Sequence, residues 1–459
     1  MDKLGLLKAR KDALLSAGGD IRKKISSLVD EGSFVELDAF SFSRNEFYGE
    51  DIPGEGVVCG FATINDFAVY IAAVNPEVIS GGLTNAGCKK IVKCLDKALK
   101  AEAPVVYLLS SKGVAVGEGV AALEGVAEVI AKTEELKGVV PQFSVSMGDV
   151  FGSAALIVGA CDVNYFMKDA CVSYVSPLVV AAKSGKSPDK ESIGGAKSSA
   201  KTALCSFVVS DLTEVRNSVC DILDVLPSFG GSLLETGDDL NRLAPAINGG
   251  ADAKAVIDAV FDKDYFIELN KFFAPEVKTG IGRIGGYSAA AIVFDGKDGV
   301  SLNKDNIRKI KDFYYFCGDN ELPVVTFVNT LGLSYGESDS VSTILKDLNS
   351  LVYAFKYENP KINVVYGKAI GLGYTLFGSK ALGADYAFAF ADAEISVVNS
   401  EEGVEIEFAA NGGDKAQIKA RFLADGMDAM NAAKCGYIDN VIEPQNVRPY
   451  LISALQTLV

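Results

Sequence analysis

No histidine occurs among the 459 residues of this sequence. This absence excludes Ser-His-Asp and Cys-His nucleophile arrangements, zinc sites built on histidine, and acid–base catalysis by an imidazole. If the chain is an enzyme, its proton acceptor is therefore a carboxylate, a lysine, a tyrosine or the substrate's own cofactor.

The cysteines lack the spacing of a metal or redox motif. There are nine of them, an odd number, and none stands in a C-x-x-C arrangement. The closest two, Cys88 and Cys94, lie six positions apart on an expected helix. Buried thiols in a reducing cytoplasm are therefore the prediction, with no disulfide and no metal site.

Long apolar segments are missing as well. The first residues, MDKLGLLKARKDALL, carry charges throughout and lack the apolar core of a signal peptide. No uncharged run reaches the roughly 18–20 residues that a spanning helix needs. The longest, residues 322–336, is interrupted by Pro323 and Asn329. We expect a soluble cytoplasmic protein that does not insert into a membrane.

Positive charge is in short supply. Lys and Arg number 44 against 60 Asp and Glu, a net charge of −16, which argues against binding to nucleic acid. A helix N-terminus can still hold an anionic ligand in such a protein. With 49% apolar and 23% charged residues the chain is typical of globular proteins. Its length predicts more than one domain.

The pattern of apolar residues indicates an α/β layered fold. Residues 105–109 and 143–147 are expected to be buried strands, and each is followed by a glycine-containing turn and a helix. Alternation of this kind is typical of a largely parallel sheet covered by helices.

An internal repeat is the strongest sign of organisation. Pro104-Val105-Val106, then Ser110–Gly113, correspond to Pro323-Val324-Val325 and Asn329–Gly332, 219 residues later. Gly152 corresponds to Gly371 at the same offset, and residues 60–64 resemble residues 280–284. Glycine, proline and acidic residues gather in residues 228–260, where we expect a boundary. The prediction is two homologous domains, residues 1–228 and residues 229–459.

Two glycine turns share one physical design. Residues 148–155 and residues 367–374 each place a glycine turn between a strand and a helix whose first N–H groups have no partner in that helix. Such amides can stabilise an enolate or another oxyanion. Taken alone, each segment is better explained as a tight structural turn than as an anion site, but their recurrence at equivalent repeat positions favours function.

Other motifs leave two interpretations open. Glu118 and Glu337 occupy matching repeat positions, either as catalytic carboxylates or as groups that cap a helix or fix a loop. Lys89, Lys90 and Lys93 share one expected helix, either to meet a phosphate or as a solvated helix face.

Several segments resemble one known family. They run in order from about Leu28 to the C-terminus: residues 28–37, 54–58, 138–142, 193–197, 282–286, 394–395 and 403–408. On these residues the chain resembles the carboxyltransferase subunits of biotin-dependent acyl-CoA carboxylases and decarboxylases, of which the propionyl-CoA carboxylase β subunit is typical. The resemblance implies two crotonase-like domains in tandem, in agreement with the repeat.

The same resemblance implies the chemistry and its residues. A carboxyl group would move between biotin, carried by a separate biotin carboxyl carrier protein, and an acyl-CoA of the propionyl-CoA or methylmalonyl-CoA type. The biotin enolate would itself take the α-proton, so no histidine would be needed, and no metal is expected in this subunit. Backbone amides would hold the two oxyanions. Their positions match Gly152 and Ser153 in the first domain and Leu372 and Gly373 in the second.

Further glycines and partners come with the resemblance. The residues expected to bind biotin and acyl-CoA are Gly81, Gly82, Gly113, Gly332 and Gly371. The expected assembly is a homo-oligomer, a hexamer built as a trimer of dimers, in which the first domain of one chain faces the second domain of another. The expected partners are the carrier protein and, with it, a biotin carboxylase or a membrane decarboxylase subunit.

Departures from the family pattern motivate a second hypothesis. The family's Asp-Ser-Gly-Gly-Ala-Arg segment reads Ser110–Ala115 here, its Pro-Gly-Phe turn reads Leu331–Leu333, and a specificity-related acidic position is Thr375. The alternative to an active carboxyltransferase is a catalytically reduced paralogue that serves as a structural or regulatory subunit. A crotonase-type hydratase or hydrolase, the third hypothesis, would not explain the duplication.

Overall fold

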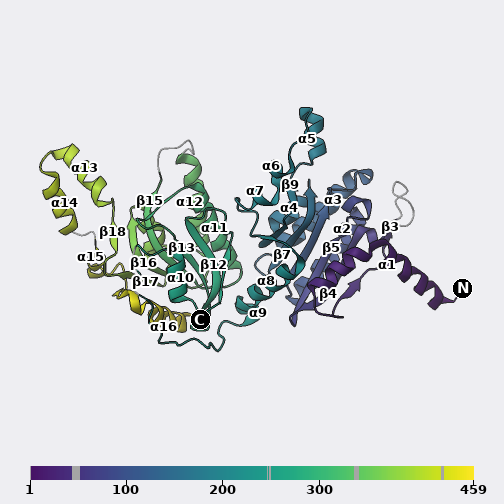
Figure 1. Cartoon of the computed structure of the whole chain (residues 1–459), viewed down its shortest axis with the longest axis horizontal. Coiled ribbons are helices and arrows are strands. Elements are labelled where there is room, and N and C mark those ends of the chain that lie inside the picture. The colour runs from purple at the N-terminus through teal and green to yellow at the C-terminus, as the bar shows by residue number, and fades with distance from the viewer. Residues whose placement is uncertain (1, 44–51, 246, 248–249, 335–340, 425–427) are drawn as a thin grey trace. The chain divides into compact units, whose positions relative to one another are not determined.

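The computed structural model describes residues 2–43, 52–245, 247, 250–334, 341–424 and 428–459. The chain forms two compact units, Met1–Leu223 and Asp224–Val459, each an α/β layered structure as expected (Figure 1). The assignment of residues 1–228 and 229–459 to two homologous domains remains our proposal.

Unit 1 is built on an eight-stranded sheet with the order β1-β4-β5-β6-β7-β8-β10, in which β9 also pairs with β7. The pairs that involve β4 are antiparallel, whereas every pair from β5 onward is parallel. The strands are β1 (Val35–Leu37), β4 (Val57–Ile64), β5 (Phe67–Val74), β6 (Val105–Ser111), β7 (Gln142–Phe151), β8 (Val163–Met167), β9 (Cys171–Ser173) and β10 (Phe207–Val209). The short strands β2 (Phe42–Ser43) and β3 (Ile52–Pro53) pair separately.

Helices cover this sheet and supply half of its core. The amphipathic helix α2 buries Ile91, Cys94 and Leu95 against the strand residues Tyr107 and Leu109. The helices are α1 (Lys3–Leu28), α2 (Asn85–Ala101), α3 (Val120–Leu136), α4 (Ala154–Ala160), α5 (Pro177–Ser184), α6 (Lys190–Gly194), α7 (Ala196–Ser199) and α8 (Leu212–Val225), and the short α9 (Pro227–Gly230) follows at the start of unit 2. Seven of the nine cysteines are buried, as expected, whereas Cys220 is half-buried and Cys435 is exposed.

Unit 2 repeats this plan with nine strands in the order β11-β12-β13-β15-β16-β17-β19, with β14 on β15 and β18 on β16. The strands are β11 (Phe266–Leu269), β12 (Val277–Ile284), β13 (Tyr287–Phe294), β14 (Val300–Leu302), β15 (Val324–Leu333), β16 (Lys361–Ile370), β17 (Tyr386–Phe390), β18 (Glu394–Ser396) and β19 (Asn440–Ile442). The helices are α10 (Ala253–Val260), α11 (Lys304–Asp319), α12 (Val341–Ala354), α13 (Ser400–Asn411), α14 (Lys415–Ala424), α15 (Ala429–Lys434) and α16 (Val447–Leu458). Both sheets thus begin with an antiparallel hairpin and continue parallel, as a duplicated domain requires.

An aspartate and an arginine tie the hairpin of each unit to its last long helix. In unit 2, Asp262 accepts hydrogen bonds from the Gly285 and Gly286 N–H groups, both at 2.7 Å, and from Arg448 of α16 at 2.6 Å. In unit 1, Asp30 accepts from the Asn65 and Asp66 N–H groups and pairs with Arg216 of α8.

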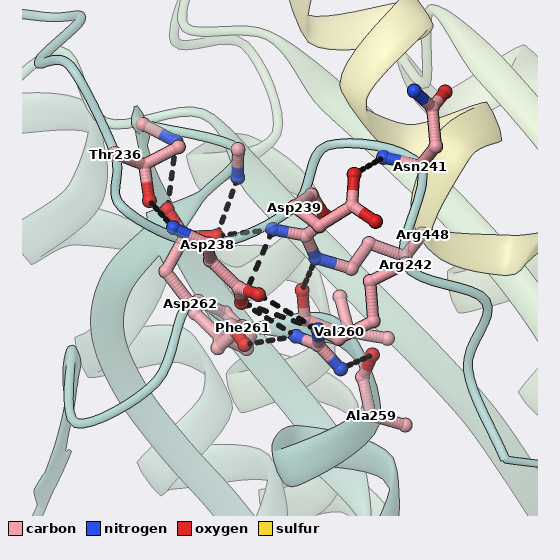
Figure 2. Close-up of polar contacts among 12 residues, drawn as sticks. Thr236, Asp238, Asp239, Asn241, Arg242, Ala259, Val260, Phe261, Asp262 and Arg448 are labelled. Atoms are coloured by element: carbon pink, nitrogen blue, oxygen red, sulfur yellow. Dashed lines mark hydrogen bonds and ion pairs between the residues drawn. The ribbon is translucent and has the colours of Figure 1, made fainter.

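The two pairs differ in burial. The Arg448 and Asp262 side chains are 0% and 2% exposed, against 33% and 24% for Arg216 and Asp30. In unit 2 a second ion pair, Asp238 with Arg242, belongs to the same polar network (Figure 2). Asp238 also contacts Arg448 at 3.4 Å, so the segment that precedes α10 is joined to α16 through this network.

Candidate functional site

The first glycine turn lies at the carboxyl edge of the unit 1 sheet, where β7 ends. Gly152 has φ +62°, a left-handed conformation that glycine adopts without strain. Its N–H donates to the Ser173 carbonyl oxygen at 3.0 Å, so this amide is not available to a ligand. A Cβ built on Gly152 would meet nothing within 4 Å, which leaves the approach to the backbone open.

The next residue offers the donor. Ser153 lies between Gly152 and α4, and within the described part of the chain its N–H donates no hydrogen bond. An amide at the start of a helix, with no protein acceptor, is the arrangement that an oxyanion requires.

Unit 2 repeats this arrangement after β16. Gly371 has φ +53° and donates its N–H to the Ser396 carbonyl oxygen at 2.8 Å. Among the residues that the structure describes, no acceptor is recorded for the N–H groups of Leu372 and Gly373. The Leu372 side chain is 47% exposed, whereas Gly373 is buried. Each unit therefore presents a matched glycine turn with unused amides.

The structure brings the three other candidate glycines of unit 1 to the same edge. A Cβ on Gly113 would lie 3.4 Å from the Phe151 carbonyl oxygen, directly before Gly152. A Cβ on Gly81 would lie 2.1 Å from the Ser110 carbonyl oxygen, and one on Gly82 would lie 3.5 Å from the Ala115 Cα. The loop 79–82 therefore packs closely on the end of β6, and a side chain at Gly81 would displace it.

In unit 2, Gly332 lies against the second turn. A Cβ on Gly332 would lie 3.0 Å from the Ile370 carbonyl oxygen and 4.0 Å from the Gly373 nitrogen. The four predicted residues Gly332, Gly371, Leu372 and Gly373 therefore form one cluster at the carboxyl edge of this sheet. Open α/β sheets bind ligands at that edge. The assignment of these residues to ligand binding stays a prediction.

Two hydroxyl groups that are not among the predicted site residues hold these clusters. Ser111 Oγ donates to the Gly81 carbonyl oxygen at 2.6 Å and accepts from the Gly113 N–H at 3.1 Å. Thr330 Oγ1 donates to the Val300 carbonyl oxygen at 2.7 Å and accepts from the Gly332 N–H at 3.0 Å. The sequence does contain a sign of this role, because Ser111 and Thr330 place a hydroxyl group at equivalent positions of the repeat.

The carboxylate of Glu118 has a structural partner. Its Oε2 accepts from the Asn85 N–H at the start of α2, at 2.6 Å. This contact supports the capping interpretation over the catalytic one. Glu337, its repeat counterpart, lies outside the described residues.

The solvated-face interpretation of the three lysines is wrong for Lys90. Lys90 is 4% exposed, and its Nζ donates to the Val57 and Gly54 carbonyl oxygens at 2.6 and 3.3 Å. Lys93 forms an ion pair with Asp38, and Lys89 is exposed. In unit 2 the equivalent Lys309 is 3% exposed and donates to the Phe273 carbonyl oxygen at 2.8 Å.

Burial of these two amines has a consequence for their protonation. Desolvation lowers the pKa of Lys90 below its ordinary value and lowers the pKa of Lys309 to about 8. Lys90 therefore ties α2 to the Val57 carbonyl oxygen and Lys309 ties α11 to the Phe273 carbonyl oxygen, so neither amine is available to bind phosphate.

The described residues bring no three His, Cys, Asp or Glu side chains into an arrangement that could hold a metal ion. In the same residues, no helix combines the length and the apolar character needed to cross a membrane.

Comparisons with known proteins identify relatives over nearly the whole chain. The family model described as "Carboxyl transferase domain" matches residues 19–459. The methylmalonyl-CoA decarboxylase subunit alpha of Veillonella parvula is 31% identical over 455 residues, which cover 95% of this chain and 89% of that protein. The propionyl-CoA carboxylase beta chain of Saccharopolyspora erythraea is 30% identical over 474 residues, with coverages of 95% and 87%.

A solved structure matches both units. It is the transcarboxylase 12S crystal structure, described as a hexamer assembly with methylmalonyl-coenzyme A and methylmalonic acid bound. The TM-score is 0.91 at 25% sequence identity, and the match covers 99% of this chain and 94% of that one.

Proposed function

The chain belongs to the carboxyl transferase domain family, and from this premise we propose that it moves a carboxyl group between carrier-bound biotin and a small acyl-CoA of the propionyl-CoA or methylmalonyl-CoA type. Its fold is the crotonase-like fold in two tandem domains, which confirms the expected fold class. The observation that carries the proposal is the pair of equivalent glycine turns, each with amides that have no acceptor in the described chain.

The chemistry needs two oxyanion sites, and each unit offers one. In unit 1 the Ser153 N–H would hold one developing negative charge. In unit 2 the Leu372 and Gly373 N–H groups would hold the other. Fixed backbone amides are effective donors because they need no reorganisation as the charge develops.

Biotin would reach these turns on a separate carrier protein and would supply or accept the carboxyl group. The turns fit a ligand of this kind, because Gly152 leaves open space around its Cα and Leu372, directly after Gly371, is 47% exposed. The chain contributes no imidazole to the proton transfer, since its sequence contains no histidine.

The direction of transfer stays open. The relatives include both a decarboxylase subunit and a carboxylase chain. Which acyl-CoA is used is equally open, and Thr375, an exposed residue just after the second turn, is the position expected to influence that choice.

We also propose a homo-oligomer, a hexamer built as a trimer of dimers. The hexamer assembly described for the transcarboxylase 12S structure supports this. Exposed apolar side chains beside each turn support it further, because Tyr174 is 85% exposed and Val397 is 83% exposed. The proposed partners are a biotin carboxyl carrier protein and, with it, a biotin carboxylase or a membrane decarboxylase subunit.

The function is tested with the purified chain, free biotin or a biotinylated carrier, and a panel of acyl-CoAs in both directions. We expect transfer with propionyl-CoA or methylmalonyl-CoA. A chain that binds acyl-CoA but transfers nothing with any carrier would instead establish the structural-subunit alternative, which the comparisons do not favour.

A further inference from the structure

A methyl group lies directly against the second glycine turn. A Cβ built on Gly373 would lie 2.4 Å from Thr330 Cγ2, a separation that real Cβ atoms essentially never show. Thr330 itself is held in place, because its hydroxyl bonds both the Val300 carbonyl oxygen and the Gly332 N–H. The methyl group therefore occupies the space that a side chain at position 373 would need.

In unit 1 the methyl group is on the other residue of the equivalent pair. The residue equivalent to Thr330, 219 positions earlier, is Ser111, which has the same hydroxyl contacts but no methyl group. The residue equivalent to Gly373, at the same offset, is Ala154, which has a methyl side chain. One unit thus combines Thr with Gly and the other combines Ser with Ala.

We propose that each of these two pairs is a complementary packing contact that fixes the orientation of the neighbouring amide donors, with Thr330 and Ser111 as positioning residues. The inference rests on the proposed function for what the donors do, but the packing contact itself does not depend on that function. In unit 2 the contact would set the position of the Leu372 and Gly373 N–H groups. In unit 1 the contact would set the position of the Ser153 N–H group.

The physical argument is one of small displacements. Donors stabilise an oxyanion when they lie 2.7–3.1 Å from the position that the charge will occupy. A clash at Gly373 must push its Cα away from β15, and the two amides move with it. A misplacement of about 1 Å can cost roughly 10²-fold in rate. The hydroxyl prevents Thr330 from rotating its methyl group away without loss of two hydrogen bonds.

The test in unit 2 uses four proteins: wild type, Gly373→Ala, Thr330→Ser and the double variant. We expect Gly373→Ala to lower kcat by about 10–10²-fold with little change in acyl-CoA binding. Thr330→Ser keeps both hydrogen bonds of the hydroxyl but removes the packing methyl group, so it should lower kcat by less than Gly373→Ala does. The double variant recreates the pair of unit 1 and should recover most of the lost kcat.

A matched control removes a different methyl group from the same strand. Thr326 is fully buried on β15, and its hydroxyl contacts Tyr314. Thr326→Ser combined with Gly373→Ala should not recover activity, because the three atoms nearest to a Cβ at position 373 belong to Thr330 and Gly332. In unit 1 the reciprocal change, Ser111→Thr, should lower kcat, and Ala154→Gly in the same chain should restore it.

The melting temperatures of the same proteins decide the packing claim separately. If wild type transfers no carboxyl group, the proposed function fails, yet a non-additive effect of Thr330→Ser and Gly373→Ala on Tm still supports the contact. Near-normal kcat and Tm for Gly373→Ala would overturn the inference. Equal rescue by Thr326→Ser and Thr330→Ser would overturn it as well.

Discussion

Removal of Arg448 should destabilise unit 2 far more than removal of its counterpart Arg216 destabilises unit 1. Both arginines anchor the last long helix of their unit to an aspartate that also caps the first hairpin. Arg448→Met leaves Asp262 as an unpaired charge in a place where its side chain is 2% exposed. Arg216→Met leaves Asp30 with solvent access, because its side chain is 24% exposed.

The difference in burial predicts different losses in the free energy of unfolding for the two variants. Removal of one partner from a buried ion pair costs about 3–5 kcal/mol in the free energy of unfolding. A partly exposed pair such as Arg216 with Asp30 contributes about 0–1 kcal/mol. For a unit of this length, 1 kcal/mol corresponds to about 2–4 °C in Tm, so Arg448→Met should lower the Tm of unit 2 by about 6–20 °C. Arg216→Met should shift the Tm of unit 1 by a few degrees at most.

Because the chain has two units, a single melting curve does not identify which one unfolds. Hydrogen exchange of the amides in α16 and α8, read alongside thermal melts, reports each unit by itself. The double variant Asp262→Asn/Arg448→Met should recover part of the loss, because it leaves no buried unpaired charge. Equal shifts for Arg448→Met and Arg216→Met would refute the reasoning from burial.

Three further predictions concern protonation, capping and assembly. Since burial lowers the pKa of Lys309 from 10.5 to about 8, the unfolded chain binds more protons between those values, and the Lys309 contribution to stability should rise with pH across that range. Lys309→Met should flatten this rise in urea midpoints, and an unchanged slope would contradict the assignment. Glu118→Ala should cost about 1 kcal/mol in the free energy of unfolding through the lost cap and leave kcat near wild type. A fall in kcat of about 10²-fold would restore a catalytic role. Light scattering should give a mass several times that of the chain. A stable monomer would contradict the proposal that the site is shared between two chains.

The layered fold and its duplication could be predicted because both depend on short sequence patterns that recur along the chain. Glycine turns after apolar strands, repeated 219 residues later at Gly152 and Gly371, locate the two candidate sites without any coordinates. The left-handed φ of both glycines agrees with the expected turns.

Contacts between distant segments could not be predicted in this way. Lys90 shares its helix with Lys89 and Lys93, and the sequence does not show that the Val57 carbonyl oxygen lies at the end of its side chain. Asp262 and Arg448 are 186 positions apart, so no local pattern connects them. The amides that remain without acceptors could be identified only once the bonds of Gly152 and Gly371 to their neighbouring strands were known.

The central claim is that backbone amides in two equivalent glycine turns carry the carboxyl transfer. It is tested most directly by turnover of wild type, Gly152→Val and Gly373→Val with biotin and methylmalonyl-CoA, with Tm measured on the same samples. Valine at Gly152, where φ is +62°, is strained and fills the open approach to the turn, whereas valine at Gly373 clashes with Thr330 and displaces the donors. The account predicts that each variant stays folded and loses about 10²–10³ in kcat. Folded variants with near-normal turnover would contradict it.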